Sequence, residues 1–496
     1  MIDILMIHGI VITMDPQRRI LADGAVAVEN GRIAAVGPTE ELMERYPDAE
    51  KVMDCRKKLI LPGFIDVHSH AGHCMLKGLA YDTPTNWMPI LTHLYHQNTT
   101  DEFWYKEGRL GALERLKFGV TCGVCVMSNA QRSDDPVFAI NHAKGYSEVG
   151  IREIVAVGPS NPPYPRKFTR FVNGQRREQM YTLDALLEGA DAAIGALNHT
   201  SNDRIRAFMA PFVMVPSVNG SGFTPPDVAP VLTDLDRYMT KRAREIASKH
   251  HTRIHTEAFG GMIRLAAHDE NALLGPDVHL HHCLNLTIDE MMILAETKTN
   301  VSSSPGAFQL ANRGPVPELI GMGVNVAIAT DGTSPGMSFD LIEAARKLHL
   351  AHQVALRDRF YMPLGKVLEM ITIDAAKAIG WDNEIGSLEV GKKADIITLN
   401  MNQPHLTPNF MPVHKLLLYG AGQDVDNVIV DGRLLMENRA VQSVSEEEIM
   451  VAAEEEAIAT IRRAGAEKYL APCDTFWGNC RVYCDTKRFD PDPAAE

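Results

Sequence analysis

His68 and His70 are the residues with the clearest chemical potential in this chain. They follow a turn at Pro62 and Gly63 and a short apolar run, a pattern that predicts a buried strand. Residues two apart on a strand project from the same face, so both imidazoles should point the same way at its carboxyl end. Two neutral imidazoles that lie together supply half of a divalent-metal site. Because buried histidines that only make hydrogen bonds give the same pattern, the pair needs support from the rest of the chain.

Three further polar side chains fall at the ends of predicted strands. His255 closes one apolar run, His282 closes the next, and Asp331 closes a third just before Gly332. In an α/β barrel the carboxyl ends of the strands gather around one mouth, where catalysis in this fold takes place. Each residue also has an ordinary interpretation, because His282 can be a hydrogen-bonded core histidine and Asp331 with Gly332 can form a turn. As an ordered set, together with the histidine pair, they predict a metal site at the mouth.

Short apolar runs that alternate with helix-like segments must position these residues. Eight such runs can be counted, and this number predicts a (β/α)₈ TIM barrel within an α/β fold class. The candidate strands are Phe64–His70, Val120–Met127, Ile151–Val157, Arg206–Val213, Thr252–Glu257, Val278–Cys283, Asn300–Ser303 and Val324–Asp331.

The two ends of the chain have a different texture, in which short β-like runs are separated by Asn-Gly and Asp-Gly turns. Because this texture returns after the barrel, we expect both ends to build one small β-sandwich domain. The predicted divisions are residues 1–61 with 384–442 for the composite β-sandwich domain, 62–383 for the metal-dependent barrel, and 443–496 for a C-terminal helix and tail.

Three segments outside the barrel strands carry weaker signals. Residues 445–464 carry three glutamates near their start, at 446–448, and two arginines near their end, at 462–463, a charge order that favours a helix. Residues 159–175 are rich in Pro, Arg and Asn and predict a long loop, either a cover over the site or a surface excursion. Cys473, Cys480 and Cys484 match no tetrahedral ligand spacing, which favours free thiols over a metal clip.

The composition is that of a globular protein with an acidic charge balance. The 496 residues include 49 basic and 63 acidic side chains, a formal charge of −14, without a long basic run, so we expect neither nucleic acid nor a membrane surface as a partner. No apolar run reaches the roughly eighteen residues of a spanning helix. The first residues lack the basic start and cleavage site of a secretion signal. Eight cysteines in so long a chain suit a reducing compartment, so the predicted location is cytoplasmic.

With these motifs the chain resembles the amidohydrolase superfamily over roughly residues 1–440. Within it, the chain is similar to the mononuclear branch that contains S-adenosylhomocysteine-type deaminases and triazine chlorohydrolases. The motifs that carry the resemblance are Pro62–Asp66, Gly119–Thr121, His282-Cys283, Thr330–Gly332 and Ile385–Asp395.

The resemblance implies one divalent metal ion per subunit, zinc in the first place and iron as the alternative. Its ligands would be His68, His70, His255 and Asp331. Relatives with two ions bridge them with a carboxylated lysine on the fourth strand, and residues 205–211 contain no lysine. A set of three nitrogens and one oxygen leaves a position for water. The resemblance also implies a homo-oligomer, either a dimer or a tetramer.

An open metal position predicts hydrolytic chemistry. A divalent ion lowers the pKa of a bound water from about 15.7 to about 7. The hydroxide would attack an sp² carbon, His282 would orient the water or the intermediate, and Asp331 would bind the ion, accept a proton, or do both in turn. The predicted function is a metal-dependent amidohydrolase that cleaves a C–N bond, in an amide, lactam, carbamate or amino group, of a small cyclic or aromatic substrate. The alternatives are a deaminase or dechlorinase of a heteroaromatic ring, and a non-catalytic scaffold of the same fold.

Glu257 departs from the pattern of the related deaminases, which carry His-x-x-Glu on the fifth strand. Here Ala258 occupies the expected position, and the carboxylate comes one residue earlier. If the strand stays regular through Glu257, this side chain shares a face with His255 and enters the site as a catalytic proton shuttle. If the strand ends at His255, the shuttle falls to Asp331 with His282.

Substrate contacts in this fold come from loops rather than strand ends. His73 and Trp87, both after the first barrel strand, are the candidate substrate-binding residues. The alternatives are a surface histidine and an aromatic side chain that staples the loop to the barrel rim. Deaminases of adenosine-like molecules carry a histidine shortly after the proline of strand four, and Phe212 follows Pro211 here, which disfavours an adenosine-type ligand.

Overall fold

The structure, a computed structural model, describes residues 2–81, 88–127, 131–172, 174–218, 231–306, 314–472 and 476–477. Trp87, Cys473, Cys480 and Cys484 lie outside the described residues.

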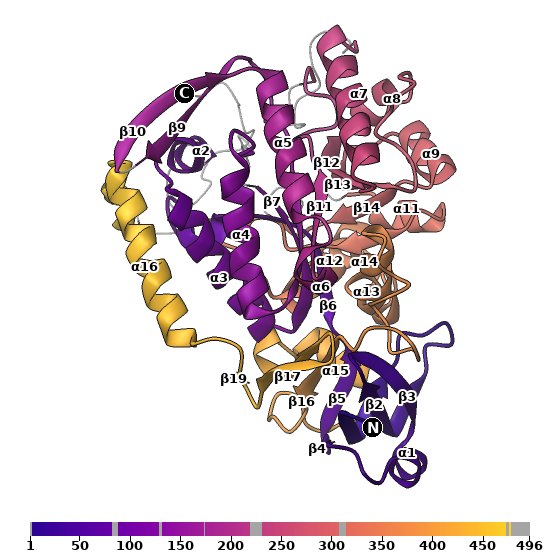
Figure 1. The fold of residues 1–496 in the computed structure, drawn as a ribbon. Coiled ribbons are helices and arrows are strands. Elements are labelled where there is room, and N and C mark those ends of the chain that lie inside the picture. The colour runs from indigo at the N-terminus through magenta and orange to yellow at the C-terminus, as the bar shows by residue number, and fades with distance from the viewer. Residues whose placement is uncertain are drawn as a thin grey trace.

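A barrel of parallel strands forms the centre of the molecule (Figure 1). In the described part of the chain, eight strands form one sheet in the order β15-β14-β13-β12-β11-β8-β7-β6. The backbone N–H of Asp331 donates to the carbonyl of His68 at 3.0 Å, so the two edges of the sheet nearly close. The predicted (β/α)₈ barrel is therefore confirmed. Its strands are β6 Phe64–His70, β7 Val120–Val126, β8 Arg152–Val157, β11 Ile205–Met209, β12 Ile254–Phe259, β13 Val278–Leu284, β14 Asn300–Ser303 and β15 Val326–Ile328.

Helices surround the barrel and begin at residues that suit helix starts. Thr233 and Thr287 each form a capping box with the acidic residue three positions later, which satisfies backbone N–H groups of the first turn. The main outer helices are α3 Asp101–Lys117, α4 Pro136–Val149, α5 Leu183–Leu197, α7 Asp234–Lys249, α9 Ile288–Thr297, α12 Leu341–Leu356, α13 Leu364–Met370 and α14 Ile373–Ala378. Further helices in the loops of the barrel are η1 His73–Leu76, α2 Met88–Gln97, α6 Thr200–Asp203, α8 Met262–Ala266 and α11 Val316–Gly321.

A second sheet combines both ends of the chain, as predicted, and lies below the barrel in Figure 1. Among the described residues it has nine strands, in the order β19-β18-β17-β16-β5-β1-β2-β3, with β4 paired to β1. Antiparallel pairing of β16 with β5 joins the late strands to the early ones. The strands are β1 Ile4–Ile12, β2 Ile20–Glu29, β3 Arg32–Pro38, β4 Lys51–Asp54, β5 Lys58–Pro62, β16 Ile396–Asn400, β17 Val425–Val430, β18 Arg433–Glu437 and β19 Ala440–Val441. The segments that connect the strands of this sheet contain helix α1 Thr39–Arg45, helix α15 Pro412–Tyr419 and the short turn η2 Gly422–Asp424.

The sequence pattern explains this second sheet. Ile4 packs in one apolar cluster and Leu5 in another, because successive side chains of a strand point to opposite faces. Asn30 and Gly31 have φ values of 52° and 76°, the left-handed pair that a tight hairpin turn requires.

Buried ion pairs join the second sheet to the barrel. Arg152, at the start of β8 and 1% exposed, donates to the carboxylate of Asp395 at 2.8 and 3.0 Å and to Asp431 at 3.2 Å. Lys393 approaches Asp431 to 3.0 Å. Because removing one partner of a buried ion pair is costly, this cluster fixes the second sheet against the amino-terminal end of β8.

The segment after the second sheet runs along the side of the barrel. The predicted helix is confirmed as α16 Glu446–Arg463, and the short turn η3 Glu467–Leu470 follows it. Arg109 of α3 contacts Glu448 at 3.0 Å, and Lys117 contacts Glu446 at 2.9 Å, so α16 is held against α3.

The prediction of a long loop over residues 159–175 is wrong for its second half. An antiparallel hairpin forms there, from β9 Arg166–Val172 and β10 Gln175–Tyr181. Phe168 is buried against the ring of His96 on α2, with ring centroids 4.9 Å apart.

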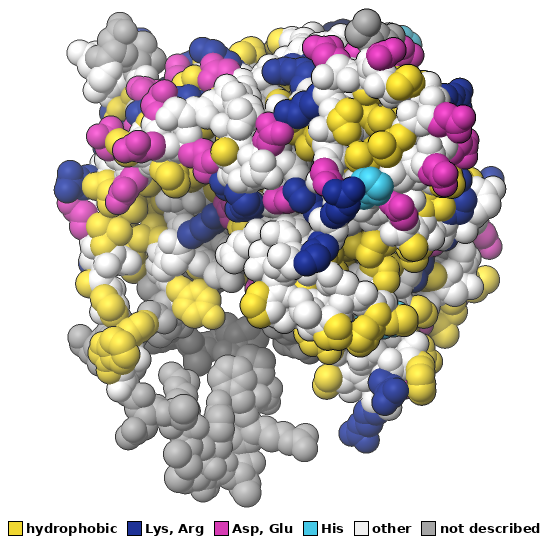
Figure 2. Space-filling model, turned by 90° about the horizontal axis from the view of Figure 1, so that it is seen from below, with side chains coloured by type: hydrophobic (Ala, Val, Ile, Leu, Met, Phe, Trp, Pro, Cys, Tyr) yellow, Lys and Arg dark blue, Asp and Glu magenta, His cyan; other side chains and the backbone are white. Residues whose placement is uncertain are grey.

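The described surface mixes charges of both signs. Figure 2 shows the molecule from below, where Lys and Arg side chains lie among Asp and Glu side chains. Within the described residues, no helix is long and apolar enough to cross a membrane.

Candidate active site at the barrel mouth

The histidine pair lies on β6, a strand whose seven residues are all buried. Nε2 of His70 lies 3.3 Å from Oδ1 of Asp331, and Nε2 of His68 lies 3.7 Å from the same oxygen. The carboxylate of Glu257 also approaches, at 3.6 Å from His70 and 3.9 Å from His68. Residues from β6, from β12 and from the end of β15 therefore meet at one point.

The sequence left open whether the fifth barrel strand, β12, ends at His255 or continues through Glu257. It runs from Ile254 to Phe259, and Glu257 forms a parallel bridge with Val213. Because the strand stays regular through Glu257, this carboxylate shares a face with His255. Of the two arrangements considered from the sequence, the structure has the one in which Glu257 enters the site.

His255 contacts the cluster from a different side. Its Nε2 lies 2.7 Å from Nδ1 of His68, and its Nδ1 lies 2.9 Å from Nδ1 of His279. The carboxylates of Asp331 and Glu257 instead face Nε2 of His68. The ring of His255 thus lines the cluster without facing the carboxylates.

Two neighbouring histidines of β13 both reach the site, although adjacent strand residues normally face opposite sides. His282 has a left-handed φ of 68°, uncommon for a non-glycine residue, and the pairing of β12 with β13 shifts register beside it. Nε2 of His281 lies 3.9 Å from Asp331, and Nε2 of His282 lies 4.0 Å from Asp331 and 3.7 Å from Glu257. His281 pairs with Glu257 in regular register and is a further site residue, stacked on His68 with ring centroids 3.6 Å apart. The irregularity at His282 turns that side chain toward the same side.

The end of β15 orients the central carboxylate. Asp331 has a φ of 64°, and its Oδ1 accepts a hydrogen bond from the backbone N–H of Gly332 at 2.6 Å. Ser304, after β14, donates to Oδ2 at 3.2 Å. Ser304 could not be predicted as a site residue, because a serine after a short strand is common in any fold.

His73, predicted to contact substrate, is 1% exposed and packs behind His70. Its ring is stacked on that of His70 at 5.1 Å and on that of Tyr95 at 5.6 Å. A Cβ atom at Gly332 would lie 2.3 Å from Nδ1 of His73, so glycine is required at that position. Trp87, the other predicted substrate contact, falls outside the described residues.

Burial controls the charges in this cluster. Burial, reinforced by neighbouring histidines, holds the pKa of His68 well below its usual value and lowers the pKa of His255 to about 3. Neutral imidazole is the form that binds a metal. Burial raises the pKa of Glu257. Burial also acts to raise the pKa of Asp331, but the neighbouring imidazoles, that of His281 first, hold it well below its usual value.

The chemistry of the donor set fits a divalent metal ion. The groups of side chains with metal-ligand spacing include His68, His70 and Glu257, and also His68, His281, His282 and Asp331. Among the described residues, the buried Nε2 atoms of His68 and His281 have no hydrogen-bond partner, although they face carboxylates. Imidazole nitrogens and carboxylate oxygens are the ligands that zinc and iron accept.

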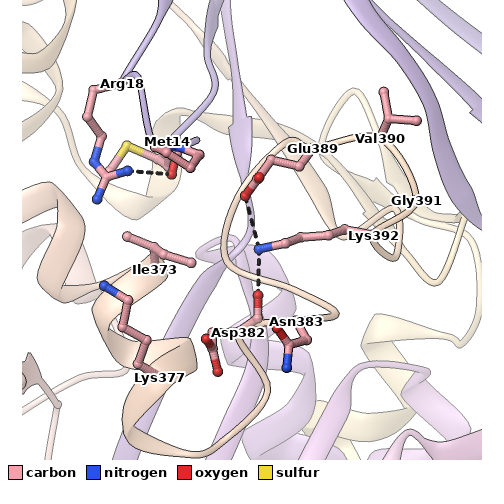
Figure 3. Close-up of a pocket in the computed structure, with 11 residues that line it drawn as sticks. Met14, Arg18, Ile373, Lys377, Asp382, Asn383, Glu389, Val390, Gly391 and Lys392 are labelled. Carbon is pink, nitrogen blue, oxygen red and sulfur yellow. Dashed lines mark hydrogen bonds and ion pairs between the residues drawn. The ribbon is translucent and has the colours of Figure 1, made fainter.

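A separate pocket lies where the second sheet meets the barrel, between the end of β1 and α14 (Figure 3). Its cations are paired: Lys392 donates to the carbonyl of Asp382 at 2.5 Å and approaches Glu389 to 3.2 Å, and Arg18 contacts Glu369 at 2.8 Å. The two contacts of Lys392 lie within the loop between α14 and β16, and the contact of Arg18 joins the β1–β2 turn to α13.

Comparisons with known proteins agree with the geometry. A model described as the amidohydrolase family matches residues 59–435, and one described as an imidazolonepropionase-like composite domain of bacteria matches residues 24–49. The chain is 29% identical, over 90% of its length and 96% of the relative, to the 5-methylthioadenosine/S-adenosylhomocysteine deaminase of Syntrophobacter fumaroxidans. It is also 29% identical, over 94% of its length and 100% of the relative, to the 5'-deoxyadenosine deaminase of Methanosarcina acetivorans.

Solved structures show the same fold. An adenosine deaminase from Xanthomonas campestris with bound zinc superposes with a TM-score of 0.78 and 22% identity, over 93% of this chain and 99% of that one. Atrazine chlorohydrolase from Arthrobacter aurescens TC1 with zinc superposes with a TM-score of 0.75 and 19% identity, over 92% of this chain and 100% of that one. The resemblance predicted from the motifs is confirmed by these matches.

Proposed function

The chain belongs to the amidohydrolase family, and from this premise and the geometry of the barrel mouth we propose that it is a metal-dependent hydrolase that cleaves a C–N bond of a small cyclic or aromatic molecule. One observation carries the proposal. Two carboxylates and three imidazoles meet at the carboxyl ends of the barrel strands, where this fold performs catalysis. Nitrogen–oxygen distances of 4.0 Å or less join the carboxylates of Glu257 and Asp331 to the rings of His68, His70 and His282.

We assign one divalent ion to His68, His70 and Asp331. His255, the fourth ligand predicted from the sequence, would have to turn its ring away from Nδ1 of His68 to join them. Zinc is favoured over iron because the adenosine deaminase and the atrazine chlorohydrolase of the same fold hold zinc. A single ion is favoured because β11 Ile205–Met209 contains no lysine to bridge two. When bound, the ion would supply a Lewis acid that lowers the pKa of water toward neutrality.

The protein side chains would handle the protons and orient the reacting groups. Glu257, 7% exposed, would take a proton from the attacking water and return it to the leaving nitrogen. His282 faces both carboxylates and would hold the developing negative charge of the intermediate. Asp331, whose carboxylate faces the same imidazole nitrogens, would help to orient the water. This division of roles needs a carboxylate whose pKa lies near the working pH, and burial raises that of Glu257 in this direction.

Hydrolytic deamination of a heteroaromatic ring is the second candidate. The relatives named above as deaminases support it. Phe212, which follows Pro211 where adenosine deaminases carry a histidine, disfavours an adenosine-type ring and favours another heterocycle. Displacement of a halide from a heteroaromatic carbon uses the same attacking water and is the third.

Ammonia release across a panel of heterocyclic amines and cyclic amides separates these reactions. Turnover of an amide without ammonia from any amine would favour ring opening, and ammonia from an amine would favour deamination. The matched control is Glu257→Gln, which keeps the size of the side chain and removes its proton transfer. Failure of the metal-loaded protein to hydrolyse any member of either class, or any halogenated ring, would contradict the proposed function.

A further inference from the structure

A fully buried arginine, Arg115 on α3, lies directly behind the histidine pair. Its Nη2 donates to the hydroxyl of Ser69 at 2.6 Å and to Oδ2 of Asp66 at 2.8 Å. Both acceptors are on β6, and Ser69 lies between His68 and His70 in the sequence. One guanidinium group therefore holds the strand that carries the pair.

Through Asp66, the same guanidinium is also connected to the segment after β15, at the other edge of the eight-stranded sheet. Oδ1 of Asp66 accepts from the backbone N–H of Thr330 at 3.0 Å, and Oδ2 accepts from the hydroxyl of Thr330 at 2.7 Å. Thr330 immediately precedes Asp331, the central carboxylate of the site. The positions of β6 and of Asp331 thus depend on one buried ion pair between Arg115 and Asp66.

A hydroxyl group, a carboxylate and an aromatic ring surround the guanidinium of Arg115. Nη1 donates to the hydroxyl of Tyr146 at 2.7 Å and lies 3.4 Å from Glu153. The ring of Phe339 lies 4.3 Å from the guanidinium carbon. A Cβ atom at Gly123 would lie 2.4 Å from Nη1, so only glycine on β7 leaves room for the guanidinium.

A second buried pair extends this layer to the loop after β6. His142 contacts Glu107 through Nδ1 and Glu153 through Nε2, the latter at 3.3 Å. Oε2 of Glu107 accepts from the backbone N–H of Gly72 at 2.9 Å, one residue before His73. Three carboxylates thus lie beneath the barrel mouth together with the basic side chains Arg115 and His142. They belong to Asp66, Glu107 and Glu153.

These side chains do not form a second metal site. Cys125, His142 and Glu153 have metal-ligand spacing, but Arg115 already approaches two of them, at 3.1 Å from the sulfur of Cys125 and 3.4 Å from Glu153. The guanidinium supplies the positive charge that a metal ion would otherwise bring.

Buried ion pairs contribute little net stability, because desolvation offsets their attraction. They do fix geometry, and groups that hold metal ligands from behind typically change metal affinity or activity by about 10- to 100-fold when they are replaced. We propose that Arg115 is a positioning residue that holds both ligand-bearing segments, β6 and the Thr330–Asp331 step, in register for metal binding. This inference rests on the proposed function.

Zinc affinity, measured by competition with a chromogenic chelator, tests the proposal. Arg115→Lys keeps one positive charge but loses the fork that reaches Ser69 and Asp66 together, so the Kd for zinc should rise by about 10- to 100-fold. Arg152→Lys is the matched control, because Arg152 is equally buried and paired with carboxylates but lies at the domain junction. It should lose thermal stability and keep wild-type zinc affinity.

Gly123→Ala gives an independent test that leaves Arg115 in place, and it serves where Arg115→Lys fails to fold. The added methyl group must displace the guanidinium, so zinc affinity should again fall. In both variants kcat should fall with KM unchanged, because neither residue contacts substrate. Wild-type zinc affinity in a folded Arg115→Lys or Gly123→Ala variant would overturn the inference, as would an equal loss in Arg152→Lys. A wild-type protein that binds no zinc or iron would instead overturn the proposed function.

Discussion

Replacing Glu257 by glutamine tests the proton transfer at the barrel mouth. The carboxylate is 7% exposed and lies 3.6 Å from Nε2 of His70 and 3.7 Å from Nε2 of His282. Glutamine has the same shape, so the packing around it should survive. The change removes the negative charge of the side chain and its ability to accept and return a proton.

The expected loss follows from the role. A positioned general acid or base contributes about 10²- to 10⁴-fold to rate, which corresponds to about 2.7–5.4 kcal/mol of transition-state stabilisation. Stability should not fall in the same variant. Within the described parts of the chain, the buried carboxylate has no lysine or arginine partner, and a neutral amide costs less to bury than a charged carboxylate.

The assay combines kcat/KM on the best substrate of the panel with thermal unfolding. Glu290→Gln is a matched control, because Glu290 is fully buried near the mouth but caps α9 through the backbone N–H of Thr287 at 3.1 Å. It should lose up to about 2 kcal/mol of stability and keep wild-type kcat. A Glu257→Gln enzyme with wild-type kcat/KM would refute the assignment and leave proton transfer to Asp331 with His282.

Substitutions at the domain junction and the mouth should separate stability from chemistry. Arg152→Met should lower the free energy of unfolding in urea by about 3–5 kcal/mol, since buried carboxylates lose their partner; a loss under about 1 kcal/mol would contradict this. Burial acts to raise the pKa of Asp431, but cationic neighbours, Arg152 among them, hold it below its usual value. The stability that this lowered pKa contributes is fully present above about pH 4 and is lost as the pH falls through the lowered pKa. Arg152→Met should therefore make stability fall less steeply with decreasing pH. Gly332→Ala, which forces His73 to move, should lower kcat by about 10- to 100-fold. Gly365→Ala, whose Cβ would meet nothing within 4 Å, should leave kcat unchanged and add up to about 1 kcal/mol of stability. Equal kcat in these two variants would contradict the packing argument.

Strand periodicity made most of the barrel predictable. Apolar runs located all eight strands, and the spacing of His68 and His70 placed both rings on one face. The same periodicity failed at His281 and His282, because a left-handed φ at His282 turns adjacent side chains to the same side. No local sequence signal marks such a bulge.

Elements without a buried face were also missed. Strand β10 of the hairpin is exposed along nearly its whole length, so its sequence lacks the alternation of apolar and polar residues that predicts a strand. The role of Arg115 could not be read from the sequence for a different reason. Its partners Asp66 and Glu153 lie 49 and 38 residues away, and an arginine within a helix normally faces solvent.

Bound metal per chain, measured by mass spectrometry alongside turnover, is the decisive test of metal-dependent hydrolysis at the barrel mouth. We expect about one zinc or iron ion per wild-type chain, and loss of both ion and turnover in Asp331→Asn and in His70→Ala. Wild-type ion content and turnover in either variant would contradict it, as would full turnover by wild-type protein stripped of metal with a chelator.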